Sequence, residues 1–266
     1  MEVVPVTVGS RGFASTSRRD WWWVTPLAIF IGLGLFVVYA TWAAFQNAHY
    51  VYGNYLSPFY APEIWGDSPH AWFGPKPAFI PDWVPFSPAL LILPFPALFR
   101  FTCYYYRGAY YKSFWADPPA CAVGEPRKSY WGEQSFPLIF QNVHRYFMWI
   151  AVIFLFLLSY DVWLAVWFPN PDGTETFGIG VGTIVLAVNV VLLSCYTLGC
   201  HVMRHIAGGA HDEVSKHPVC DRAYACSTAL NYKHQLFAWC SLFSVAFADV
   251  YIRLCSMGIW ADVRLF

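Results

Sequence analysis

The residues of this chain that could do chemistry gather in residues 192–209, at the end of a long apolar segment. Within this stretch lie Cys195, Cys200, His201, Arg204 and His205. Polar and ionisable side chains are costly where lipid or protein interior is expected, so they usually mark function. Because His201 and His205 are four residues apart, a helix places both on one face, where one metal ion could bind the two imidazoles.

The composition indicates an integral membrane protein. Of the 266 residues, 58% are hydrophobic and only 12% are charged, whereas about a quarter of a soluble domain is charged. The mean hydropathy is +0.41. Sixteen basic and sixteen acidic residues cancel, so no net charge attracts nucleic acid, and we expect no nucleic-acid partner.

The elements that must position these residues are long apolar segments. We predict an all-α fold, a polytopic bundle of five transmembrane helices over residues 24–45, 83–106, 138–168, 177–207 and 232–257. Prolines in the second segment predict a helix that is kinked or begins only near Pro88. Residues 1–20 are expected to form a flexible cytoplasmic tail, and residues 21–266 a single five-helix transmembrane domain.

The loops between the predicted helices differ in composition. Residues 46–82 are rich in proline and aromatic residues, which we expect to fold back onto the membrane surface. Residues 210–231 are expected to form a polar loop. Thirteen of the sixteen Lys and Arg residues fall on the side of the N-terminus, which predicts a cytoplasmic N-terminus and an external C-terminus.

This orientation brings six potential ligands from four helices to the cytoplasmic layer. With a rise of about 1.5 Å per residue, most lie within roughly 10 Å of that interface. A single His or Cys near a helix end is more often structural, but six at one depth predict a bound redox centre. The candidate metal ligands are Cys103, His144, Cys200, His201, His205 and His234. Disulfides are the weaker interpretation, although Cys220 and Cys226 could pair.

Two redox centres suit these residue types. Haem b needs two imidazoles from facing helices, such as His144 or His234 against His201 or His205. A Rieske-type [2Fe–2S] cluster needs two cysteines on one iron and two histidines on the other. Because haem requires no cysteine, the sulfur-rich layer favours the cluster, with Cys103 and Cys200 as its thiolates. A structural zinc ion is a further alternative.

Other polar residues allow two interpretations. Asp249 and Arg253, with Asp161 on another helix, lie toward the outer side and suit either buried ion pairing or a proton or quinone site. Near the inner layer, aromatic and basic side chains could line a pocket for a quinone head group. The predicted quinone ligands there are Trp131, Arg145 and Tyr146, beside the run 104–107.

Several longer motifs carry a resemblance to a known family. They are Val38-Tyr-Ala-Thr-Trp-Ala-Ala-Phe-Gln-Asn47, Tyr55-Leu-Ser-Pro-Phe-Tyr60, Cys103-Tyr-Tyr-Tyr-Arg107, Pro118-Pro-Ala-Cys-Ala-Val123, Gln141-Asn-Val-His-Arg-Tyr146, Cys195-Tyr-Thr-Leu-Gly-Cys-His-Val-Met-Arg-His205 and Asp249-Val-Tyr-Ile-Arg253. Together they resemble the single-chain, five-helix membrane anchor of a bacterial succinate dehydrogenase, respiratory complex II, of the mycobacterial class. The resemblance covers nearly everything after the tail.

The resemblance implies a location in the bacterial cell membrane and two partner subunits. A flavoprotein would oxidise succinate, an iron–sulfur protein would dock on the cytoplasmic face, and membrane quinone would accept the electrons. Anchors of this class can hold a Rieske-type [2Fe–2S] cluster where other classes hold haem b. Haem-binding anchors carry a histidine seven residues before an Arg-His pair; here Arg204-His205 is present, but the upstream residue is Leu198.

The expected function is therefore that of a non-flavin membrane subunit, which passes electrons through an embedded centre to quinone. A transporter or channel is one alternative, with Asp161, Asp249 and Arg253 as its intramembrane charges. Against it stand the lack of internal repeats and the gathering of Cys and His on one side. A purely structural membrane anchor is the other alternative.

Overall fold

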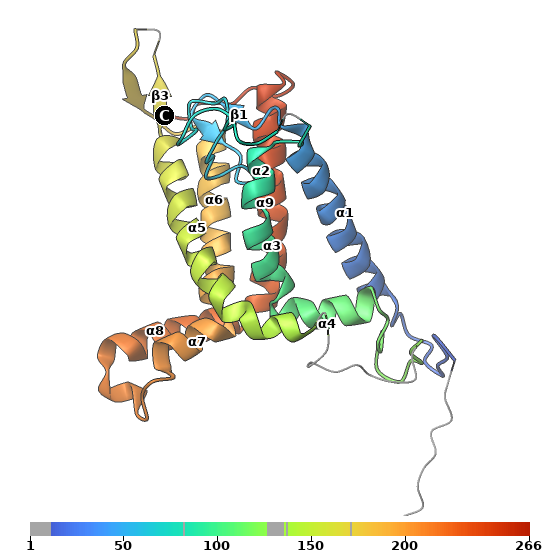
Figure 1. Cartoon of the computed structure of the whole chain (residues 1–266). Helices are drawn as coiled ribbons and strands as arrows, with labels where there is room; N and C mark the ends of the chain where they lie inside the picture. The colour runs from blue at the N-terminus through green and yellow to red at the C-terminus, as the bar shows by residue number, and fades with distance from the viewer. Residues whose placement is uncertain (1–11, 82, 127–135, 137, 171) are drawn as a thin grey trace, which may run out of the picture. The chain divides into compact units, whose positions relative to one another are not determined.

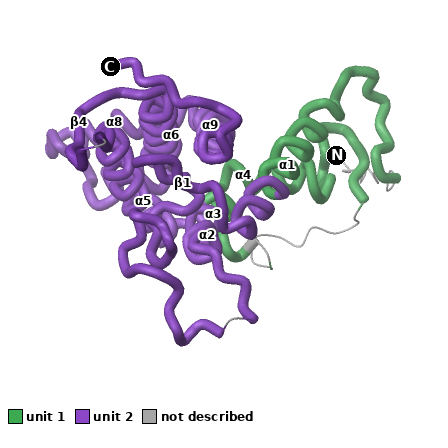
Figure 2. Tube along the Cα trace, turned by 90° about the horizontal axis from the view of Figure 1, so that it is seen from above, with its two compact units in different colours: residues 1–37, 100–143 green, residues 38–99, 144–266 purple. Residues whose placement is uncertain are grey.

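The computed structural model describes residues 12–81, 83–126, 136, 138–170 and 172–266, most of which are helical (Figure 1). The chain divides into two compact units (Figure 2). Unit 1 contains residues 1–37 and 100–143, and unit 2 contains residues 38–99 and 144–266.

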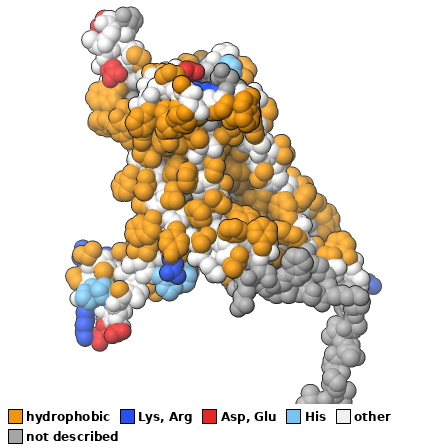
Figure 3. All heavy atoms as spheres, viewed as in Figure 1, with side chains coloured by type: hydrophobic (Ala, Val, Ile, Leu, Met, Phe, Trp, Pro, Cys, Tyr) orange, Lys and Arg blue, Asp and Glu red, His pale blue; other side chains and the backbone are white. Residues whose placement is uncertain are grey.

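The described helices agree with the predicted membrane bundle. Four are long and apolar enough to cross a membrane: α1 (Val24–Gln46), the segment Ile139–Leu164, α6 (Val181–Leu198) and α9 (His234–Ser256). They become five when the broken pair Pro88–Phe101 and Tyr104–Ser113 is counted as one span. Apolar side chains cover the flanks of the spans, and acidic and basic side chains gather near the ends (Figure 3). Four or five membrane helices are therefore present, as the hydropathy pattern predicts.

The second and third predicted spans each begin with an irregular segment. The second is helical from Pro88, as its prolines predict, and consists of α2 (Pro88–Ile92) and α3 (Pro94–Phe101), followed by α4 (Tyr104–Ser113). The third opens with the 3₁₀ helix η1 (Leu138–Val143), and α5 (His144–Leu164) follows directly.

The core of unit 2 forms where α6 packs against both α5 and α9. Two small residues, Ala165 directly after α5 and Ala248 of α9, allow close approach, and Leu186 of α6 packs in the same cluster. Tyr55 from the loop after α1 completes this core cluster. The loop therefore contributes to the interior of the unit.

Residues 47–81 fold over one end of unit 2. A short hairpin joins β1 (Val51–Tyr52) to β2 (Tyr55–Leu56), and these strands contact α9 and α5 respectively. Tyr60 is fully buried, and the Tyr50 hydroxyl donates a 2.9 Å hydrogen bond to buried Glu63. The prediction that the loop aromatics lie on the membrane surface is wrong for these tyrosines, because their rings fill space between the loop and the helices.

The C-terminal segment holds the start of α6 in place. Asp262 accepts hydrogen bonds from the Gly182 amide at 2.8 Å, the Tyr55 hydroxyl at 2.8 Å and the Tyr251 hydroxyl at 2.7 Å. A carboxylate suits this position, since the first amides of a helix lack partners and carry partial positive charge. Burial raises the pKa of the Tyr55 phenol, which therefore remains a hydrogen-bond donor. Next to this site, strands β3 (Trp167–Pro169) and β4 (Glu175–Phe177) form a second hairpin.

The fourth predicted helix, over residues 177–207, is broken in the structure. Helix α6 ends at Leu198, and Gly199 and Cys200 separate it from α7 (His201–Gly208). Ser227 donates a 2.8 Å hydrogen bond to the Leu198 carbonyl, and Asn231 does the same to the Gly199 carbonyl. These side chains satisfy carbonyls that a helix end leaves unpaired, and so they stabilise the break.

Both donors lie on α8 (Pro218–Asn231), which follows the short 3₁₀ helix η2 (Val214–Lys216). The prediction of a polar loop over residues 210–231 is therefore wrong for most of its length. Helix α8 packs along α7, and the two run across one end of unit 2 (Figure 1).

Within unit 1, residues 12–20 are bound to a later loop. The Ala14 amide donates to the Gly124 carbonyl, and the Gly124 amide donates to the Ser15 carbonyl, both at 2.8 Å. Arg18 pairs with Asp20 and donates a 2.9 Å hydrogen bond to the Cys121 carbonyl. Residues 1–11 of the predicted tail lie outside the described residues.

Candidate functional site

Three of the predicted ligands lie at one end of unit 2. His144 is the first residue of α5, His234 is the first residue of α9, and Cys200 directly precedes α7 where the chain leaves α6. Because α5 and α9 both start at the end where α6 finishes, the three residues share one level of the bundle. The common depth predicted from the sequence is therefore present for these three.

A chain of contacts joins these residues. His144 Nε2 lies 3.1 Å from Cys200 Sγ, and both side chains are buried. The His144 ring stacks on Phe99 with centroids 4.8 Å apart, and the Tyr196 ring stacks on His234 at 5.0 Å. Phe99 and Tyr196 meet edge to face at 5.6 Å. These five residues, of which His234 is half-buried and the other four are buried, are called the buried cluster below.

Sequence reasoning missed the two aromatic members of the buried cluster. Tyr196 precedes Cys200 by four residues, and Phe99 precedes Cys103 by the same interval. In a helix this spacing places the two side chains on one face, one turn apart. An aromatic residue one turn before each of two cysteines was therefore a signal that the sequence offered.

The backbone around Cys200 favours a negatively charged sulfur. Cys200 is the N-cap residue of α7, with an extended backbone conformation of φ −67° and ψ 145°. The N-terminal end of a helix carries partial positive charge, which stabilises a thiolate, the form in which cysteine binds metals. Among the residues that the structure describes, no three His, Cys, Asp or Glu side chains converge closely enough to hold one metal ion. His144 and Cys200 contact each other directly. The rings of Tyr196 and Phe99 connect His234 to His144.

Cys103 occupies the corresponding position in unit 1. It is the N-cap residue of α4, its side chain is 2% exposed, and its φ of −65° and ψ of 130° resemble those of Cys200. Two buried cysteines thus share one local arrangement, an extended N-cap residue where an apolar helix gives way to a second helix. All eight cysteines of the chain lie among the described residues, and none of them forms a disulfide there, including Cys220 and Cys226.

His201 and His205 form a separate, exposed pair on α7. Their Nε2 atoms lie 3.0 Å apart, and their ring planes are nearly perpendicular. Partial burial and the charges of His205 and Arg204 lower the pKa of His201. The shared helix face predicted for the two histidines is present. Cys200, a member of the buried cluster, directly precedes the helix that carries them, whereas the two histidine side chains are exposed.

The predicted quinone ligands do not form a described pocket. Trp131 lies outside the described residues, and Arg145 and Tyr146 are exposed on the first turn of α5. In unit 1 a small, partly open hollow has aromatic walls and the polar side chains of Arg107 and Gln141. Its lining residues are Phe101, Arg107, Tyr110, Tyr111, Trp115, Phe140 and Gln141.

The two polar groups of this hollow are held together. Arg107 Nη1 donates a 2.7 Å hydrogen bond to Gln141 Oε1, and the guanidinium lies over the Tyr104 ring at 4.6 Å. Sequence reasoning named Arg107 and missed Gln141. Gln141 is three residues before His144 in the Gln-Asn-Val-His motif, so its nearness to a candidate ligand was the available signal.

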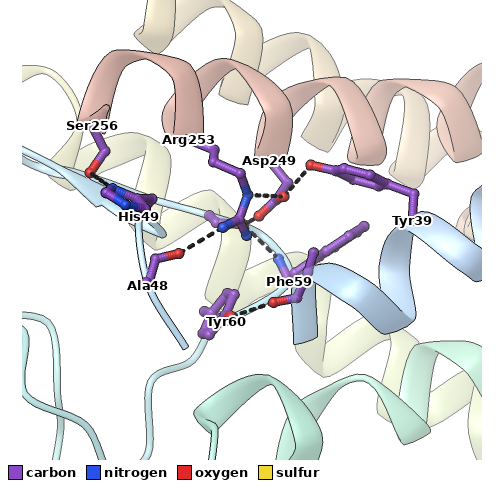
Figure 4. Close-up of polar contacts among 10 residues, drawn as sticks. Tyr39, Ala48, His49, Phe59, Tyr60, Asp249, Arg253 and Ser256 are labelled. Atoms are coloured by element: carbon purple, nitrogen blue, oxygen red, sulfur yellow. Dashed lines mark hydrogen bonds and ion pairs between the residues drawn. The ribbon is translucent and has the colours of Figure 1, made fainter. Parts of the chain in front are cut away.

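The charged residues at the other end of unit 2 form a buried network (Figure 4). Arg253 Nε lies 3.3 Å from Asp249 Oδ2, with 5% and 0% of the side chains exposed. Asp249 also accepts the hydroxyls of Tyr39 and Ser57, and Arg253 Nη1 donates to the Ala48 carbonyl at 2.7 Å. The predicted buried ion pair is therefore confirmed for Asp249 and Arg253.

Asp161, the third charged residue predicted on the outer side, shows no such partner. Its Oδ2 is buried and has no hydrogen-bond partner among the described residues. The network around Asp249 uses residues of α1, the loop after it and α9, and within it Arg253 Nη2 is buried without a hydrogen-bond partner among the described residues.

Comparisons with known proteins give concordant results. A family model described as actinobacterial succinate dehydrogenase subunit SdhC matches residues 24–258. A solved structure described as the Mycobacterium smegmatis Sdh1 complex in the apo form contains a chain that is 43% identical, with a TM-score of 0.84 and coverage of 94% of both chains. None of the curated proteins compared with the chain matches it.

Proposed function

Because this chain belongs to the actinobacterial succinate dehydrogenase subunit SdhC family, we propose that its buried cluster helps to hold a redox centre between an iron–sulfur partner and quinone. The chain is the membrane-anchor subunit of complex II in a bacterial membrane, and it assembles with the flavoprotein and iron–sulfur subunits. Succinate chemistry belongs to the flavoprotein, so this chain contributes the electron path to quinone. The buried contact between His144 Nε2 and Cys200 Sγ is the observation that carries the proposal.

The donor set suits a Rieske-type [2Fe–2S] cluster. Such a cluster needs two thiolates on one iron and two imidazoles on the other. The proposed ligands are Cys103 and Cys200 with His144 and His234. Three of them share one end of unit 2, and the predicted topology, with the N-terminus cytoplasmic, puts the end of α3 that leads to Cys103 on the same side of the membrane.

This chain's own residues give the site three properties. The N-terminal end of α7 favours the thiolate form of Cys200, and Cys103 occupies the same N-cap position before α4. The rings of Phe99 and Tyr196 orient both imidazoles by stacking. Burial of His144, Cys200 and Cys103 excludes water from the ligands. When bound, the cluster would supply one-electron transfer.

Haem b is supported less well by the packing. A haem needs two imidazoles with open space between them for a planar ring system. Here the rings of Phe99 and Tyr196 pack directly on His144 and His234 and occupy space beside both. The residue seven positions before His205 is Leu198, which cannot bind iron.

For quinone, we propose the hollow around Arg107 and Gln141 as the binding site. Aromatic walls can stack on a quinone ring, and a guanidinium can donate a hydrogen bond to its carbonyl oxygen. The hydrogen bond to Gln141 Oε1 orients the Arg107 guanidinium. Trp131, Arg145 and Tyr146 remain the quinone ligands that the sequence predicts.

Substitution of Gln141 by leucine tests this quinone site and the proposed function together. We expect the KM for a quinone analogue to rise about tenfold, with a smaller change in kcat, since one hydrogen bond of about 1.4 kcal/mol no longer positions Arg107. The measurement is succinate-driven quinone reduction by the purified complex. Arg145→Gln and Tyr146→Phe serve as matched controls. If these raise the KM and Gln141→Leu does not, the hollow is excluded as the quinone site.

A further inference from the structure

The exposed pair His201 and His205 has the geometry of a chelating site. In a zinc complex, each imidazole nitrogen lies about 2.0–2.1 Å from the metal ion. An N–Zn–N angle of about 90° to 109° then places the two nitrogens about 2.9–3.4 Å from each other. The two Nε2 atoms lie 3.0 Å apart in this structure. The spacing of four residues keeps them on one face of α7, so a small ring rotation would direct both lone pairs at one ion.

The surroundings of the pair leave it open to a ligand. Both side chains are exposed. The neighbouring Arg204 is directed toward α8, where its Nη2 donates a 2.8 Å hydrogen bond to the Tyr224 hydroxyl and its guanidinium lies over the Tyr224 ring. The Arg204 guanidinium therefore has its own partner on α8, although its charge still acts on His201.

We propose that His201 and His205 bind a divalent transition-metal ion of the zinc and copper class at the surface of α7. Such ions favour imidazole nitrogen and bind most tightly among the divalent first-row metals. Two protein ligands leave the remaining coordination positions to water. The site is distinct from the buried cluster, and the proposal does not depend on the redox centre.

A second histidine pair provides a matched control. His211 and His217 stack with ring centroids 3.8 Å apart and planes only 26° apart. A metal binds in the plane of an imidazole, so stacked rings do not direct their lone pairs at one ion. This pair lies on the same helical hairpin, between α7 and the start of α8, and it should not chelate.

Calorimetric titration of the purified complex with Zn²⁺ tests the proposal. We expect saturable binding whose affinity falls more than about tenfold in His201→Gln and in His205→Gln, because each removes one of two ligands. The double variant His211→Gln/His217→Gln should bind as the unsubstituted protein does. The circular dichroism spectrum should be the same for all variants, since each of the four histidine side chains is exposed or half-buried. Absence of zinc binding, or binding that both single variants retain, overturns the proposal.

Discussion

Replacement of Cys200 by alanine is expected to lower the iron and acid-labile sulfide bound by the complex and to abolish succinate-driven quinone reduction. Cys200 is buried, contacts His144 Nε2 directly and caps α7, so no exposed side chain can take its place. Loss of one thiolate removes half of the sulfur ligands that a Rieske-type centre requires. The measurement is iron and sulfide content of the purified complex, together with the rate of quinone reduction.

Cys195→Ala is the matched control for this prediction. Cys195 lies on α6, five residues before Cys200, and it is only half-buried. Its replacement should leave iron content and quinone reduction unchanged. Reduction of a soluble dye with succinate should persist in both variants, because that reaction belongs to the partner subunits. If Cys200→Ala retains all of its iron and sulfide, Cys200 is not a ligand.

The second large effect is expected at the opposite end of unit 2. Asp249→Ala should lower the free energy of unfolding by about 3–5 kcal/mol, because it leaves the Arg253 guanidinium buried without its counter-charge. The hydroxyls of Tyr39 and Ser57 lose their acceptor in the same variant. The thermal unfolding midpoint of the purified complex in detergent measures the change.

A double variant separates charge from packing. Asp249→Leu/Arg253→Met removes both charges and keeps much of the side-chain volume, so its loss of stability should be clearly smaller than that of Asp249→Ala. Equal losses in the two variants would show that the ion pair does not determine the stability of this region. Quinone reduction should survive in the double variant, since the network lies at the end of unit 2 away from the buried cluster.

Helix length and position were largely predictable from hydropathy. The first span was predicted over residues 24–45 and is Val24–Gln46, and the last was predicted over 232–257 and is His234–Ser256. These segments are continuous apolar runs, and the membrane requires them to satisfy their own backbone hydrogen bonds as helices. The kink near Pro88 followed from proline geometry alone.

The break between α6 and α7 was not predictable in the same way. The local pattern around Gly199 and Cys200 is compatible with a continuous helix, and the break depends on hydrogen bonds from Ser227 and Asn231, about thirty residues later. Helix α8 was missed because it is polar, although Pro218 at its start and Asp221 in its first turn are ordinary N-terminal signals.

The same break explains what the sequence could say about the candidate site. Counting residues along the predicted helices placed all six candidate ligands at one depth of the membrane. The different environments of buried Cys200 and exposed His201 and His205 depend on the position of the break, since α6 ends at Leu198, Cys200 lies in the break and His201 begins α7. Whether Cys103 completes the ligand set remains a prediction, supported by its matching N-cap conformation.

The most direct test of a membrane-embedded iron–sulfur centre is the electron paramagnetic resonance spectrum of the purified complex, recorded with its optical spectrum after reduction. We predict a Rieske-type signal with an average g value below that of the free electron, which is lost in Cys200→Ala, and no haem absorption band. A sharp haem band, or a spectrum with no Rieske-type signal in the unsubstituted complex, would contradict this account.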